Sequence, residues 1–309
     1  MSDGIARPGR VHEITSTANP IIKDMRRLAQ KRHREETGLF LCEGLKLARD
    51  ALAAGWPIAT LIYAKESKGD EAVSRLAARV VASGGDVLEV SRRVLTTVLR
   101  RDNPAGVAAV VRRRLVALGD VRATGEDVWV ALDRVRDPGN LGTVLRTADA
   151  VGASGVILIG DTVDPFGLEA VRATMGSLFA LPLVRAGEEE FLSWRPSWTG
   201  QVVGTHLEGA TDYRTIRYAG APQLIIMGNE QRGLSDALAA ACDALALIPQ
   251  APRRGAAEGT VGAGGADSLN LAVATGVMLF EVRRHALGRE RALGRERALN
   301  APTASGESA

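Results

Sequence analysis

The sequence predicts an α/β protein of two domains, and two observations support this fold class. Short apolar runs typical of strands alternate with helical patterns along most of the chain. A polar, glycine-containing stretch interrupts the alternation, and 309 residues are enough for two separate cores. We expect a flexible leader over 1–10, a smaller domain over 11–114, a linker over 115–127, a larger domain over 128–287, and a frayed or disordered tail over 288–309.

In the smaller domain, four helical patterns alternate with four strand patterns. We expect helices over 20–33, 44–54, 71–83 and 92–100, and strands over 39–42, 58–63, 87–90 and 106–111.

The larger domain repeats this alternation. We expect strands over 128–132, 155–159, 180–184, 201–204, 223–227 and 244–248, and helices over 142–152, 167–178, 234–242 and 268–287. Short apolar strands separated by helices indicate a mostly parallel sheet covered on both faces. The glycine- and alanine-rich stretch 251–267 breaks the pattern, and we interpret it as either a mobile loop over a site or a tolerated surface excursion.

The distribution of charge is compatible with a nucleic-acid partner. The net charge is only +3, but basic side chains cluster in two places. The first cluster comprises Lys23, Arg26, Arg27, Lys31, Arg32 and Arg34, and the second Arg92, Arg93, Arg100 and Arg101. Such clusters fit a surface that binds RNA, although a solvated helix surface has the same pattern.

No apolar run approaches the roughly 20 residues that span a bilayer, and the first ten residues lack a signal-peptide core. We therefore expect a cytoplasmic protein with no membrane partner. Cys42 and Cys242 lie far apart, and the four histidines are scattered, so we predict no metal site.

Three segments carry residues suited to chemistry. In DPGNLGTVLRTA (137–148), a glycine-containing turn leads into a helix, which places Asn140 and Arg146 near N–H groups that suit an anion. In the second segment, the strand at 224–227 runs into Gly228 and Glu230, where parallel sheets keep their ligand crevices. The alternative is that Glu230 caps the next helix or pairs with Arg232.

The third segment is Ile248-Pro249-Gln250, followed after a gap by Ser268-Leu269-Asn270. Ser268 suits the N-cap of the helix that follows, with Asn270 in its first turn.

Together these segments resemble the SpoU/TrmH family of ribose 2′-O-methyltransferases in the SPOUT class. The family motifs are matched by Asn140, Gly142 and Arg146, by Gly228 and Glu230, and by Ile248, Pro249, Ser268, Leu269 and Asn270. Residues 14–16, 19–20 and 40–44 also resemble the family's substrate-binding domain of the ribosomal-protein L30e type. The sequence departs from the family at Gln250, where methionine is usual, and in the insertion before Ser268.

The resemblance implies a deep trefoil knot, S-adenosylmethionine as methyl donor, and a homodimer whose interface borders the site. By residue, Gly228, Ile248, Pro249 and Leu269 would hold the donor, and Thr205 would close over it. Arg146 would engage the target ribose, with Asn140, Glu230, Ser268 and Asn270 arranging the site. The expected substrate is 23S ribosomal RNA, either in routine modification or in antibiotic resistance.

The required reaction is in-line attack of a ribose 2′-oxygen on the methyl carbon of a sulfonium. Positioning alone supplies about 7–11 kcal/mol in well-oriented reactions. The family proposal makes Arg146 the base, but a guanidinium has a pKa above about 12, so stabilising the developing alkoxide is the easier role.

Three alternatives stay open at this point. One is a methyltransferase acting on transfer RNA, and another is a catalytically silent RNA-binding protein of the same fold. The third is a nicotinamide-dependent enzyme, which the absence of a G-x-G-x-x-G pattern after the first strand of the larger domain disfavours.

Overall fold

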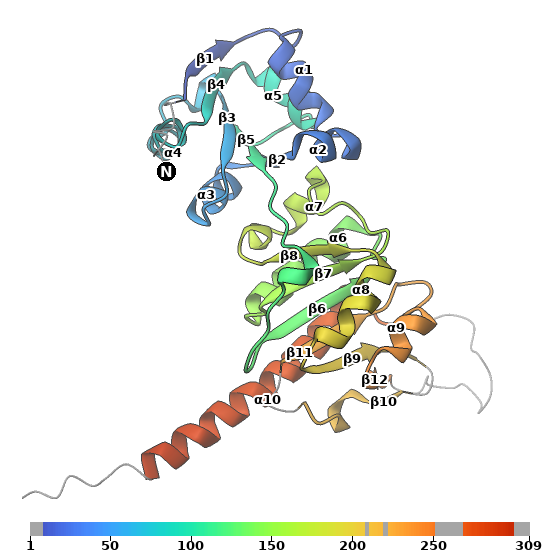
Figure 1. Cartoon of the computed structure of the whole chain (residues 1–309). Helices are drawn as coiled ribbons and strands as arrows, with labels where there is room; N and C mark the ends of the chain where they lie inside the picture. The colour runs from blue at the N-terminus through green and yellow to red at the C-terminus, as the bar shows by residue number, and fades with distance from the viewer. Residues whose placement is uncertain (1–8, 208–209, 219–221, 251–267, 300–309) are drawn as a thin grey trace, which may run out of the picture.

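The computed structural model describes residues 9–207, 210–218, 222–250 and 268–299, and forms two α/β domains (Figure 1). Most of the predicted leader, the whole insertion 251–267 and residues 300–309 lie outside the described residues. The predicted fold class is confirmed: two α/β domains, the larger with a parallel sheet.

The N-terminal domain is built on a mixed sheet with the strand order β1-β4-β3-β5-β2. Its strands are β1 (Val11–Ile14), β2 (Leu39–Glu43), β3 (Ile58–Ala64), β4 (Asp86–Val90) and β5 (Val107–Arg112). Its helices are α1 (Pro20–Arg27), α2 (Lys31–Thr37), α3 (Leu45–Ala53), α4 (Glu71–Ala82) and α5 (Arg92–Leu99). The edge strand β1 was not predicted, because only Ile14 of its four residues is buried and the apolar pattern is weak.

The single helix predicted over 20–33 is wrong, because α1 and α2 are separate helices. Leu28 is buried at the break, and its carbonyl accepts a hydrogen bond of 2.7 Å from Nη1 of Arg34. The break turns His33 and Arg34 inward, which a continuous helix with an exposed basic face would not do.

The C-terminal domain is built on a parallel sheet with the strand order β10-β12-β9-β11-β6-β7-β8. Its strands are β6 (Val128–Asp133), β7 (Gly155–Ile159), β8 (Leu183–Ala186), β9 (Gln201–Thr205), β10 (Thr211–Asp212), β11 (Gln223–Met227) and β12 (Ala244–Leu247). Its helices are α6 (Pro138–Ala150), α7 (Leu168–Ala173), α8 (Glu188–Trp194), α9 (Asp236–Ala240) and α10 (Leu271–Leu299).

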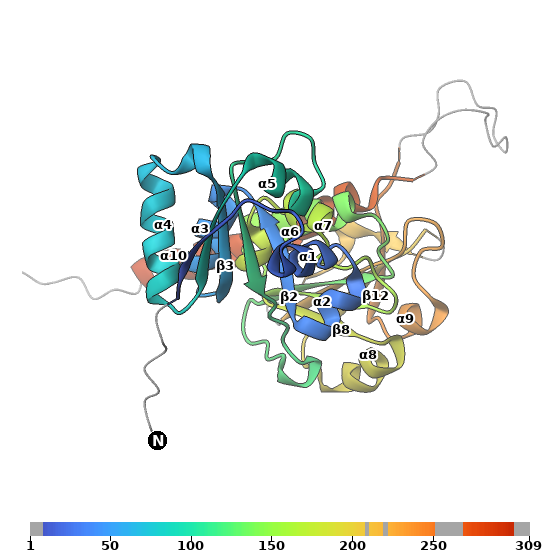
Figure 2. The ribbon, with the colours of Figure 1, turned by 90° about the horizontal axis from the view of Figure 1, so that it is seen from above.

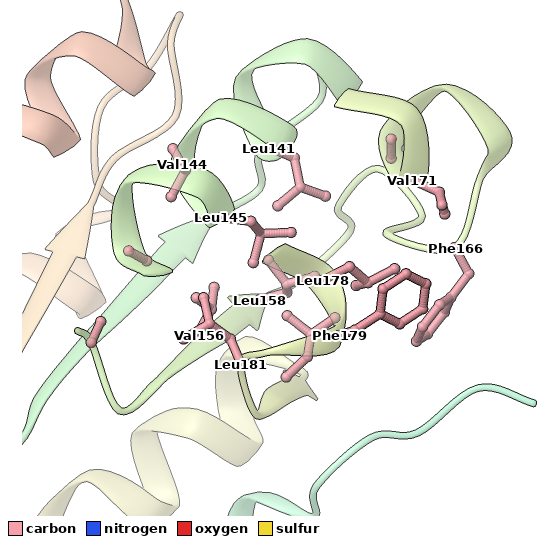
Figure 3. Close-up of a cluster of buried hydrophobic side chains, with 14 of the residues drawn as sticks. Leu141, Val144, Leu145, Val156, Leu158, Phe166, Val171, Leu178, Phe179 and Leu181 are labelled. Atoms are coloured by element: carbon pink, nitrogen blue, oxygen red, sulfur yellow. The ribbon is translucent and has the colours of Figure 1, made fainter. Parts of the chain in front are cut away.

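The two faces of this sheet carry different helices. Apolar side chains of α6, α7 and α10 pack on one face, and those of α8 and α9 pack on the other. Figure 3 shows Leu141 and Leu145 of α6 above Leu158 of β7, with Phe166 and Phe179 closing the cluster. Both faces are therefore covered, as the continuous apolar strands require.

The segment predicted as a linker packs against the C-terminal domain. Leu118 and Val121 are buried in the core on the α8 side, and Val116 pairs with Val184 as an isolated bridge. No helix in the described part of the chain is both long and apolar enough to cross a membrane.

Candidate functional site

The first motif lies on α6, which begins earlier than predicted. Pro138 occupies the first turn, and Oδ1 of Asp137 accepts a hydrogen bond of 2.6 Å from the backbone N–H of Asn140. Asn140 therefore lies within the helix and not in a preceding turn. The carboxylate of Asp137 thus already occupies one of the N–H groups that the sequence suggested for an anion, that of Asn140.

Three side chains predicted for the site form one hydrogen-bonded chain. Nδ2 of Asn270 donates to Oδ1 of Asn140 at 2.8 Å, and Nδ2 of Asn140 donates to Oε1 of Glu230 at 2.9 Å. These residues come from α6, from the segment after β11 and from the start of α10, so 130 residues of sequence close into one cluster.

The sequence placed the helix cap at Ser268, but Asn270 is the N-cap of α10. Its Oδ1 accepts the backbone N–H groups of Ala272 at 2.9 Å and Val273 at 3.3 Å. Ser268 is exposed and lies two residues before the cap. The cap fixes which end of the Asn270 amide faces Asn140, because its oxygen is held by the backbone of α10.

The second motif forms a tight turn after β11. Asn229 and Gly233 exchange both backbone hydrogen bonds, at 3.0 and 2.9 Å, and Gly233 has a φ of +66° that favours glycine. Ser235 caps α9, so Glu230 does not. Within the described residues Glu230 forms no ion pair with Arg232, which leaves its carboxylate for Asn140.

The turn is also tied to the loop before α6. Nδ2 of Asn229 donates to the carbonyl of Arg134 at 2.8 Å. Arg134 has a φ of +50°, unusual for a residue other than glycine, and its guanidinium forms two hydrogen bonds with buried Asp133, at 2.8 and 2.7 Å. These bonds raise the pKa of Arg134, and the strained backbone marks the loop as a candidate functional element.

A cavity of about 680 Å³ opens beside this cluster. Its lining is polar and holds three arginines and two carboxylates, comprising Arg134, Arg136, Asp137, Asn140, Asn229, Glu230, Gln231 and Arg232. Arg134, Arg136 and Asp137 were not predicted as site residues. Their position directly between strand β6 and helix α6 was the signal that could have identified them.

The residues predicted for the donor lie at the carboxyl ends of neighbouring strands β12, β9 and β11. Thr205 ends β9, Gly228 follows β11, and Ile248 and Pro249 follow β12. The N–H of Gly228 donates to Oγ1 of Thr205 at 3.4 Å, which joins two of these ends. Leu269 is 39% exposed just before α10.

Arg146 does not join the cluster within one chain. It lies six residues beyond Asn140 on the same helix, which corresponds to about 9 Å of rise and a different helix face. Its side chain is exposed, and it has no hydrogen bond or ion pair with the described part of the chain. The guanidinium of Arg146 is therefore accessible to a molecule that approaches from outside.

The predicted RNA-binding side chains divide into two groups. Lys23, Arg26 and Arg27 on α1, and Lys31 and Arg32 on α2, are exposed. Arg34 is buried, with 6% exposure, and its Nη2 lies 2.6 Å from Oδ2 of Asp164 in the other domain. Its assignment to an RNA-binding surface is therefore wrong, because the guanidinium is already enclosed and paired.

Two further observations concern metal binding and thiol chemistry. No group of three or more histidine, cysteine or acidic side chains in the described ranges is arranged to hold a metal ion. Burial raises the pKa of both thiols, Cys42 and Cys242, to about 12, which does not favour thiolate chemistry.

Known proteins match both domains. Residues 127–280 match the SpoU rRNA Methylase family, and residues 19–109 match the MRM3-like substrate binding domain. The 23S rRNA (uridine(2479)-2′-O)-methyltransferase of Streptomyces viridochromogenes is 32% identical over 274 residues, which cover 85% of this chain and 88% of that protein.

Solved structures agree. The rRNA methyltransferase of Sinorhizobium meliloti is 53% identical, with a TM-score of 0.81 over 90% of this chain and 99% of that one. The same enzyme with AdoMet bound has a TM-score of 0.80 at 54% identity, over 89% of this chain and 98% of that one. The resemblance seen in the sequence motifs is thus confirmed, and the chain belongs to the SpoU rRNA methylase family of S-adenosylmethionine-dependent RNA 2′-O-methyltransferases.

Proposed function

We propose that this enzyme transfers the methyl group of S-adenosylmethionine to a ribose 2′-hydroxyl of 23S ribosomal RNA. The observation that carries the proposal is the hydrogen-bonded chain Asn270–Asn140–Glu230 beside a polar cavity lined by three arginines, at the carboxyl edge of the parallel sheet. The Streptomyces viridochromogenes relative, named for ribose methylation of 23S rRNA, supports the choice of RNA. A ribosomal substrate also implies a cytoplasmic enzyme.

The donor would lie across the ends of β9, β11 and β12. The residues fit a nucleoside, because Ile248 is only partly buried and Leu269 is exposed, which offers apolar contact beside the hydrogen-bonded pair of Thr205 and Gly228. The bound donor supplies the electrophilic methyl carbon. The trefoil knot that would bend the donor is part of this proposal.

The cavity suits a nucleotide with its phosphates. Arg136 and Arg232 are exposed at its edge, and an arginine fork can grip a phosphate oxygen with two donors. Asn140 and Asn270 would orient the ribose, with Glu230 holding the Asn140 amide in place and exposed Ser268 beside them. Attack by the 2′-oxygen then needs charge stabilisation at that oxygen, the role we assign to Arg146.

Because Arg146 faces away from its own cluster, we propose that it acts in a homodimer. Val273 and Phe280 on α10 are 54% and 58% exposed and lie seven residues apart, on one side of the helix. Helix α10 packs beside α6, which carries Arg146. A second copy that covers this apolar face would bring the guanidinium of Arg146 to the partner's site.

Mixed dimers test this arrangement. Arg146→Ala and Glu230→Gln should each be inactive, and a mixture should regain part of the activity, because one site in a mixed dimer then carries both intact residues. Phe280→Asp should yield monomers in sedimentation experiments and abolish methyl transfer. A fully active monomer would contradict the proposal.

The reaction itself is tested with labelled S-adenosylmethionine and either ribosomal or transfer RNA. We expect label in 23S rRNA, at a linkage that resists alkali, and loss of most activity in Arg146→Lys. Methylation of transfer RNA would favour the alternative substrate, and methylation of a base would refute the mechanism. Thermal stabilisation by the donor without any transfer would identify a silent RNA-binding protein.

A further inference from the structure

The two domains are joined by an interface of ion pairs, hydrogen bonds and apolar packing, which we call the joint. Arg34 and Asp164 form a buried ion pair across it, with side-chain exposures of 7% and 9%. Each partner forms a further hydrogen bond. Arg34 also donates to the carbonyl of Leu28 at 2.7 Å, and Asp164 accepts the N–H of Phe166 at 3.0 Å. Two charges buried in this way hold a defined geometry.

A second ion pair crosses the joint at Glu43, the last residue of β2. Nε of Arg172 on α7 donates to Oε2 of Glu43 at 2.6 Å, while Oε1 of Glu43 accepts the N–H of Ala105 at 2.9 Å. The carboxylate of Glu43 has only 5% exposure. Lys46 on α3 adds a third link, donating to the carbonyl of Met175 at 2.7 Å.

Aromatic rings fill the space between these links. The ring centroids of Phe40 and Phe166 are 5.0 Å apart, and those of Trp56 and Phe179 are 5.3 Å apart. Nε1 of Trp56 also donates to the carbonyl of Phe179 at 3.2 Å. The buried apolar cores of the two domains are continuous through these rings, so rotation at the joint would expose them.

The joint is connected directly to the catalytic helix. Arg172 lies on α7, and α7 packs on α6 so closely that Gly142 has no room for a side chain beside Ala173. Helix α6 carries Asn140 at its start. Figure 1 shows α7 between α6 and the N-terminal domain, and in Figure 2, seen from above, the helices of the N-terminal domain overlie α6 and α7.

We propose that this joint determines which nucleotide is methylated. It holds the exposed basic side chains of α1 and α2 at a fixed span from the Asn140–Glu230 cluster, so RNA bound by the N-terminal domain presents one ribose to the site. Arg34, Glu43, Asp164 and Arg172 are positioning residues in this scheme. The inference rests on the proposed function, because it requires RNA contacts in both domains.

The test is a charge reversal at the more accessible pair. In Arg172→Glu, two carboxylates face each other and the joint loosens. We expect kcat/KM for 23S rRNA to fall at least about tenfold, the equivalent of one charged hydrogen bond. Mapping of 2′-O-methyl groups should then show label at neighbouring nucleotides, with an unchanged Kd for S-adenosylmethionine. The conservative variant Arg172→Lys, which keeps the positive charge opposite Glu43, should retain a single site.

The control is Arg195→Glu, which breaks a two-bond ion pair with Asp243 inside the C-terminal domain. It should lower stability and leave the methylation site unchanged. If Arg172→Glu does not fold, Arg172→Gln takes its place, with a smaller spread of sites expected. A folded joint variant that methylates the wild-type nucleotide alone, at the wild-type kcat/KM, would overturn the inference. Absence of rRNA methylation by the wild-type enzyme would instead refute the proposed function.

Discussion

Gly142→Ala should destabilise the C-terminal domain even though alanine is the better helix former. A Cβ at position 142 would meet the Cβ of Ala173 and lie 2.7 Å from its carbonyl carbon and 2.9 Å from its Cα. Two of these atoms belong to the backbone of α7, so no side-chain rotation relieves the overlap. Overpacking of this kind costs about 1–3 kcal/mol. Alanine returns about 0.5–1 kcal/mol through helix propensity, which leaves a net loss of up to about 2.5 kcal/mol, with a midpoint near 1 kcal/mol.

Gly276→Ala is the matched control, because Gly276 also lies inside a helix of this domain. There the nearest atom to a new Cβ is Cγ2 of Thr147 at 3.7 Å, an ordinary contact. We expect this variant to be as stable as the wild type or more so, by up to about 1 kcal/mol.

Urea unfolding followed by tryptophan fluorescence measures both variants, since Trp129, Trp194 and Trp198 report on this domain. Gly142→Ala should also lower methyl transfer, because α6 carries Asn140. Equal or greater stability of Gly142→Ala, or an equal loss in Gly276→Ala, would refute the packing argument.

Three further outcomes follow from contacts in the structure. Asn140→Asp places a second carboxylate against Glu230 and removes the hydrogen bond that Asn140 donates. We expect kcat to fall about 10²-fold and the affinity for S-adenosylmethionine to stay unchanged, as rate measurements and calorimetry can check. Lys68→Met should lower stability at neutral pH, because Lys68 holds the pKa of Glu89 below its usual value. That stabilisation is present above the unfolded pKa of about 4.3 and is lost as pH falls through the folded pKa, so the urea midpoints of variant and wild type should converge in acid. Cys42, whose pKa burial raises to about 12, should resist alkylation at pH 8 until urea unfolds its domain, and rapid labelling of the native protein would contradict its burial.

The strands of the C-terminal domain were the easiest elements to predict. Those expected over 155–159 and 223–227 have these same bounds in the structure, because buried parallel strands are continuous apolar runs. Helix starts were less predictable. Helix α6 begins four residues earlier than expected because Asp137 caps it, and α10 begins three residues later because Asn270 does.

The composition of the candidate site followed from the motifs, but its arrangement did not. The motifs identified Asn140, Glu230 and Asn270, which the structure brings together. A run of basic residues does not reveal which one turns inward, and the partner of Arg34 is 130 residues away at Asp164. Long-range pairing of this kind depends on how the two domains pack together, and a local sequence pattern carries no information about that packing.

The cap on α10 gives the amide chain of the site a single direction. Because Oδ1 of Asn270 is consumed by two backbone N–H groups, only its NH₂ end faces Asn140. Asn140 must therefore present its oxygen to Asn270 and its NH₂ to Glu230. Neither amide can flip alone, since a flip would set two NH₂ groups or two oxygens against each other. The N-cap of α10 thus determines which end of the Asn140 amide on α6 donates and which accepts. Aspartate at position 270 would preserve the helix cap, but it has no NH₂ group to donate to Asn140, so the orientation of that amide would no longer be fixed.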